Sequence, residues 1–267
     1  MRPFQRPPGL PTMGQEIVDF LRFVARPRPG PRLAGRSAGS GLRADLCLNA
    51  PWWRLLHWAV LLWMVNVFVF APLALSAADA GGAQHRLDIH NLPWMTALIW
   101  APIIEELTFR HALRRPAMLW WFVPLMASIL VQGAGIASGL LAAAAALLAL
   151  APAWYPADHR WRAGWRMSWR GRRLMRRAYP WLFHAAALAF AAVHLFNFRL
   201  NAMALVLLPL LVLPLLVLPQ WVTGLVLGWM RVRRGIGAAI ALHAIFNGGP
   251  LLLIGLVLHF APQLAVG

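Results

Sequence analysis

Two adjacent glutamates, Glu105 and Glu106, lie inside an apolar segment and are the residues best placed to do chemistry. They are two of only eight acidic residues in the chain. The stretch that holds them, residues 91–115, is long enough to cross a bilayer. A charged group at the centre of a membrane helix costs roughly 2.5–3.5 kcal/mol on insertion scales. Carboxylates in such a place predict a functional site, provided that polar partners lie nearby.

Helical spacing predicts different roles for the two acids. Glu106 and Arg110 are four residues apart, so they share a helical face and can form an ion pair. Glu105 projects about 100° away from Glu106, and we expect it to face a cavity. The alternative is that both acids only lock helices together through Arg110.

Further polar side chains lie on later apolar segments. His194 follows Phe190 by four residues, and Asn247 follows His243 by four, which puts each pair on one helical face. Imidazole and carboxamide groups can bind a common water, metal ion or oxyanion. They can equally hydrogen-bond a neighbouring helix, which is a common structural use of His and Asn in membranes.

Together these patterns resemble the motifs of the type II CAAX prenyl protease family, also called the CPBP or Abi family of intramembrane proteases. The resemblance covers about residues 93–250 and keeps the family's motif order. The EExxxR, FxxxH and HxxxN motifs correspond to Glu105-Glu106-LTF-Arg110, Phe190–His194 and His243–Asn247. One departure is His111, because family members often have glycine after the arginine.

The resemblance implies roles for these residues. It implies four catalytic groups that hold or activate water and bind the oxyanion: Glu105, His194, His243 and Asn247. Glu106 and Arg110 are implied to support them. No cofactor is certain, and zinc or another divalent metal bound by Glu105, His194 and His243 is the open alternative. The sequence lacks HExxH and does not decide between a bound metal and water activated by a glutamate.

The composition indicates a polytopic membrane protein. Hydrophobic residues make up 60% of the chain and charged residues 12%, against about 45–50% and 25% in globular domains. The net charge of +17 comes from arginine, since the sequence contains no lysine. Because these arginines cluster between apolar segments, topology and anionic headgroups explain them better than nucleic acid. Cys47 is the only cysteine, which excludes an intramolecular disulfide.

Two regions are expected along the chain. Residues 1–50 are rich in Pro, Gly and Arg and should form a largely disordered cytoplasmic tail. Within this tail, residues 15–26 have helical spacing and predict either a short interfacial helix or a transient one. Residues 51–267 should form the membrane helix bundle.

The positive-inside rule orders the apolar segments into about seven to eight spans with a cytoplasmic N-terminus. The arginines up to Arg54 and those of residues 160–177 mark cytoplasmic segments. Prolines interrupt residues 200–230, so this segment is either one broken span or a short span with a re-entrant piece. The expected fold is an all-α, polytopic transmembrane helix bundle.

Depth along the spans offers a check on the site. Glu105 and His243 each lie nine residues from an arginine, or about 14 Å from the cytoplasmic edge. His194 lies seventeen residues beyond Arg177, or roughly 25 Å in. It is too deep to meet the others unless residues 178–184 lie along the interface.

The leading hypothesis is an intramembrane endopeptidase that cleaves a peptide bond near the cytoplasmic face of a bacterial inner membrane. The alternative is a catalytically silent membrane protein that binds a peptide or a partner protein. A proton or metal transporter is less well supported, because neither inverted repeats nor a second set of intramembrane acids is evident. The expected partners are a peptide or protein substrate and anionic lipid headgroups, and no nucleic acid.

Overall fold

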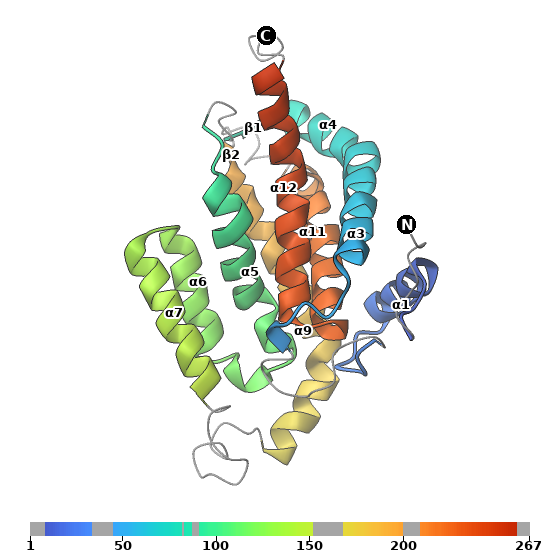
Figure 1. The fold of residues 1–267 in the computed structure, drawn as a ribbon, viewed down its shortest axis with the longest axis vertical. Helices are drawn as coiled ribbons and strands as arrows, with labels where there is room; N and C mark the ends of the chain where they lie inside the picture. The colour runs from blue at the N-terminus through green and yellow to red at the C-terminus, as the bar shows by residue number, and fades with distance from the viewer. Residues whose placement is uncertain are drawn as a thin grey trace, which may run out of the picture.

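The chain folds into an all-α bundle in the computed structural model, which describes residues 9–33, 45–81, 83–86, 91–151, 168–199 and 209–260. The helices are α1 (Met13–Ala25), α3 (Trp52–Val65), α4 (Ala71–Gly81), α5 (Ala101–Phe109), α6 (Phe122–Gln132), α7 (Ile136–Leu150), α9 (Trp169–Val193), α11 (Pro209–Arg233) and α12 (Ile236–Phe260). The short strands β1 (Gln84–His85) and β2 (Phe198–Arg199) pair antiparallel beside the bundle (Figure 1).

Four helical segments of the described chain are long and apolar enough to cross a membrane: Trp52–Asp79, Trp169–Asn197, Val212–Arg233 and Ile236–Phe260. The first of them joins α3 and α4 through a π-helical turn, Asn66–Phe70. The helices α6 and α7 are apolar but have fewer than the roughly 20 residues of a full span. The transmembrane helical fold is therefore confirmed, whereas the count of seven to eight spans and the side of each terminus stay predictions.

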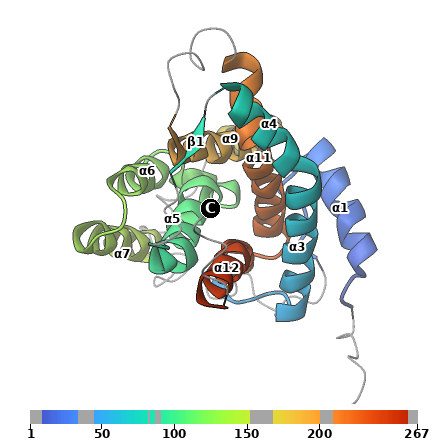
Figure 2. The same ribbon diagram turned by 90° about the horizontal axis from the view of Figure 1, so that it is seen from above.

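The helix α11 lies at the centre of the bundle. It packs against α4, α9 and α12, and α12 in turn packs against α3 and α5. The hairpin of α6 and α7 lies outside α5 (Figures 1 and 2). Buried side chains from the central helices, among them Trp58, Phe183 and Trp229, form one apolar core.

The described part of the proline-rich segment is one continuous helix. Both Pro214 and Pro219 lie inside α11. A tight turn at Gly235, with φ of +120°, then reverses the chain into α12. A Cβ at Gly235 would stand 2.8 Å from the carbonyl oxygen of Asp45, so only glycine fits both the conformation and the space.

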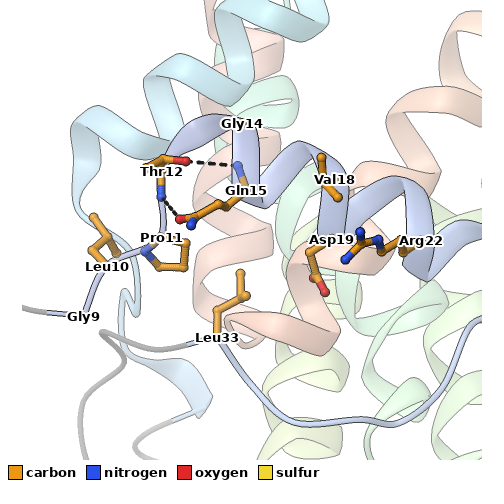
Figure 3. A pocket seen from close by; sticks show the side chains of 10 residues that line it. All are labelled: Gly9, Leu10, Pro11, Thr12, Gly14, Gln15, Val18, Asp19, Arg22 and Leu33. Carbon is orange, nitrogen blue, oxygen red and sulfur yellow. Dashed lines mark hydrogen bonds between the residues drawn. The ribbon is translucent and has the colours of Figure 1, made fainter.

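Within the predicted N-terminal tail the structure describes residues 9–33, and a helix lies where the sequence predicted a short one over residues 15–26. Here α1 begins with a capping box (Figure 3). The backbone N–H of Gln15 donates to the Thr12 hydroxyl oxygen, and the backbone N–H of Thr12 donates to Gln15 Oε1. Its apolar face packs on the core through Ile17, Phe20 and Phe23. The other predicted tail residues up to 44 lie outside the described chain.

Long-range ion pairs explain why this segment folds against the bundle. Glu16 pairs with Arg234 at 2.5 Å, Asp19 with Arg233 at 2.8 Å, and Asp45 with Arg231 at 2.7 Å. Each arginine at the end of α11 therefore has an acid that comes from the first 50 residues. Composition gives no sign of these pairs, because the partners are about 190–220 positions apart in the sequence.

Candidate active site

The acidic pair lies on α5, which continues from a π-helical turn, Thr96–Trp100, and ends at Phe109. The two acids differ in their surroundings, as the helical spacing predicts. The Glu106 side chain is fully buried, whereas 13% of the Glu105 side chain is exposed. Glu105 is therefore the acid that an outside molecule can reach.

The carboxylate of Glu106 connects two other predicted residues. Its Oε1 accepts a hydrogen bond from Arg110 Nη1 at 2.7 Å and lies 3.0 Å from His243 Nδ1. The predicted ion pair with Arg110 is thus present. The Arg110 guanidinium also lies 3.8 Å from the centre of the Phe190 ring, a cation–π contact. The Phe of the FxxxH pattern therefore helps to hold the buried arginine.

These contacts fix the tautomer of His243. An ionised carboxylate only accepts hydrogen bonds, so Nδ1 of His243 carries the proton that is donated to Glu106. In the neutral imidazole Nε2 is then an acceptor, and it lies 3.8 Å from Glu105 Oε2. This Glu105 oxygen is buried and has no hydrogen-bond partner among the described residues. Two acceptors thus lie close together, and one molecule beside the pair could donate a hydrogen bond to each.

His194 shares a cavity with Glu105. The cavity has a volume of about 450 Å³, and its lining includes Glu105, Leu130, His194 and Asn197. The Nδ1 of His194 donates to the carbonyl of Phe190 at 2.8 Å, which leaves Nε2 as the second ring nitrogen for a ligand. The structure therefore brings His194 to the carboxylate.

Residue counting predicts that His194 lies deeper in the membrane than Glu105 and His243, and the length of α9 explains why the three can still lie near one another. Residues 178–184 do not run separately along an interface but belong to the continuous helix Trp169–Val193. Its arginine-rich first turns extend beyond the neighbouring helices (Figure 1). Counting residues from Arg177 therefore overestimates how far His194 lies from the end of the bundle.

Asn247 contacts the backbone just before the acidic helix. Its Nδ2 donates to the carbonyl of Ala97, at 3.0 Å, in the π-helical turn before α5. Among the described residues that line the cavity of Glu105, neither His243 nor Asn247 is present. The carboxamide thus ties α12 to the start of the acidic helix.

A comparison with protein-family models finds a match to the type II CAAX prenyl endopeptidase Rce1-like family over residues 89–249. The matched region covers more than half of the 267 residues and contains all three motifs. The chain belongs to this family. No curated protein and no solved structure matches the chain. Membership in the CAAX endopeptidase family implies a protease, and the long apolar helices make the chain an integral membrane protein.

Two residues near the family's motifs were not predicted from the sequence. Asn197 lines the cavity of Glu105 and His194, three residues after the histidine. Gly224 lies where a Cβ would stand 3.0 Å from the Phe190 ring and 3.4 Å from Arg110 Nη2. Asn197 is a polar residue at the end of an apolar span and could have been noticed. Gly224 has no such signal, because its role comes from contact between helices.

The metal alternative fits this site poorly. The part of the chain that the structure describes has no group of three His, Cys, Asp or Glu side chains arranged to hold a metal ion. We therefore derive no step through a metal at Glu105, His194 and His243.

Proposed function

We propose that this CAAX-family protein is an intramembrane endopeptidase in which Glu105 activates a water molecule. The observation that carries the proposal is the pair of acceptors, Glu105 Oε2 and His243 Nε2, that lie 3.8 Å apart. A water that lies beside this pair of atoms can donate one hydrogen to each, which orients its lone pair toward a bound peptide carbonyl. Both acceptors lie in a largely buried site, where such interactions are strengthened.

The reaction then needs one base and one route for the proton. As the water oxygen bonds to the carbonyl carbon, Glu105 takes the water proton and the carbonyl oxygen becomes an oxyanion. Glu105 passes the proton to the amide nitrogen as the carbon–nitrogen bond breaks. The products are a new carboxyl terminus and a new amine. His194, which faces the same cavity, donates Nδ1–H to the Phe190 carbonyl, so its Nε2 is an acceptor that is suited to help hold the water.

The remaining motif residues support this arrangement. Glu106 fixes the tautomer of His243, and Arg110 balances the Glu106 charge. Without Arg110, Glu106 would be a buried charge that has lost its ion-pair partner. Asn247 holds α12 against the turn that leads into α5.

We place the arginine-rich end of the bundle, with Arg114, Arg115 and the first turns of α9, on the cytoplasmic side of a bacterial inner membrane. The positive-inside rule supports this orientation. The cleaved bond would then enter the bundle from the cytoplasmic leaflet. The name of the family suggests that the substrate is a peptide with a prenylated C-terminal motif.

The proposal is tested with the full chain in liposomes and a farnesylated peptide that ends in a CAAX motif. We expect mass spectrometry to find a new peptide terminus with the wild type and none with Glu105→Gln. Cleavage should also survive removal of divalent metals. Binding of the peptide without cleavage by the wild type would instead favour the silent-binder alternative.

A further inference from the structure

A second pocket lies at the arginine-rich end of the bundle, apart from the residues of the candidate active site. Its volume is about 160 Å³, which is room for a group of a few heavy atoms, since a water occupies roughly 30 Å³ in the liquid. The polar residues of its lining are Arg114, Arg172, Arg176 and Tyr179. The rest of the lining, such as Pro29, Leu113 and Met175, is largely apolar.

Tyr179 shows that this pocket is built for a polar ligand. The side chain belongs to α9 and is 2% exposed. Its hydroxyl is buried and has no hydrogen-bond partner among the described residues. A buried hydroxyl without a partner is costly, so a ligand that accepts its hydrogen bond would relieve that cost.

Arg114 provides a fixed positive charge in the same pocket. Its guanidinium donates to the backbone carbonyls of Val232, at 2.6 Å, and Gly30, at 2.9 Å. The arginines at the end of α11 pair with acids, but in the described chain neither Arg114 nor Arg176 forms an ion pair. Burial, together with the nearby Arg32, lowers the pKa of Arg114 to about 10. The lowered pKa is the effect expected of a charge that lacks a close anion.

We propose that this pocket binds a phosphate group, held by Arg114, Arg176 and the Tyr179 hydroxyl. Arginine suits phosphate because its guanidinium donates charge-assisted hydrogen bonds to the anion. At Arg114, Nε and Nη2 already donate to backbone carbonyls, so Nη1 is the group left for the phosphate. The first turns of α9 are rich in arginine, as is typical of a segment at a membrane interface. The headgroup of an anionic phospholipid is therefore one source of the phosphate, and free inorganic phosphate is the other.

The test uses the full-length protein in detergent. Native mass spectrometry measures whether phosphatidylglycerol stays bound, and thermal melts compare inorganic phosphate with chloride at equal ionic strength. The wild type should retain one phosphatidylglycerol, or melt at a higher temperature in phosphate. The first result identifies a lipid headgroup and the second a free anion. If the wild type neither retains phosphatidylglycerol nor melts at a higher temperature in phosphate, the proposal is overturned.

Three variants separate the pocket from general attraction to anions. Tyr179→Phe removes no charge and should weaken binding about tenfold, as expected for one lost hydrogen bond to a charged group. Arg176→Gln should weaken it at least as much. The control Arg177→Gln removes the same charge from a neighbouring position that does not line the pocket, and it should have a clearly smaller effect. Unchanged binding by Tyr179→Phe, or equal losses from the two arginine variants, would refute the site.

Discussion

Replacing Glu16 by glutamine tests how the N-terminal helix is held. The carboxylate is fully buried and lies 2.5 Å from Arg234 and 3.7 Å from Arg54, whose side chains are also buried. It also accepts a hydrogen bond from Trp58 Nε1 at 2.9 Å. Glutamine keeps an acceptor for Trp58 but removes the charge that balances two arginines.

Breaking a buried ion pair from one side typically costs about 3–5 kcal/mol. Since 1.4 kcal/mol is a factor of ten, the loss of about 3 kcal/mol raises the open population of α1 roughly a hundredfold. We expect hydrogen exchange to show this increase in the amides of Met13–Ala25, while α12 stays protected.

Asp19→Asn is the matched control. Asp19 also lies on α1 and pairs with Arg233, but 29% of its side chain is exposed. A pair that water can reach contributes less, about 1 kcal/mol or below. Exchange in α1 should therefore rise less than tenfold. Equal effects of Glu16→Gln and Asp19→Asn would refute the reasoning that burial sets the strength of these pairs.

Three further predictions follow from other residues. Gly224→Ala should reduce the rate of peptide cleavage and should not raise the melting temperature, because the new Cβ would lie 3.0 Å from the Phe190 ring. In the control Gly139→Ala the new Cβ would lie 3.8 Å from Trp100, so the melting temperature should stay the same or rise. Burial raises the pKa of Asp45, but Arg231 and Arg32 outweigh it and lower this pKa from 3.8 to about 2. The lowered pKa should therefore add about 2 kcal/mol to the free energy of unfolding above pH 4, and this contribution should disappear as the pH falls toward 2. Unfolding free energies measured across that range should lose this dependence in Asp45→Asn, and an unchanged acid profile would contradict the assignment. His111→Leu should raise the melting temperature, because both ring nitrogens are buried without a partner among the described residues; a lower melting temperature would show that the imidazole contributes to folding.

Local spacing predicted the parts of the site that lie on one helix. The pair of Glu106 and Arg110 and the greater exposure of Glu105 both follow from helical geometry, and both are present. The contact between Glu106 and His243 joins residues 137 positions apart, so no spacing rule could give it. Only the resemblance to the family suggested that the motifs meet.

Contacts between distant segments lay beyond what the sequence could predict. The composition of residues 1–50 says nothing of partners as distant as Arg233 and Arg234, with which α1 pairs. The spacing of His243 and Asn247 places them on one face, but it does not show which group each contacts. The structure turns His243 toward the acids and joins Asn247 to the backbone of Ala97.

The central claim is that Glu105 acts as the base while Glu106 positions His243. The most direct test is the rate of peptide cleavage in a single turnover with saturating enzyme, measured for the wild type and for Glu105→Gln at equal folded fraction. General-base catalysis typically contributes about 10²- to 10⁴-fold. We predict that Glu105→Gln binds the peptide but cleaves it at least about a hundredfold more slowly. A cleavage rate for Glu105→Gln equal to that of the wild type would contradict the account.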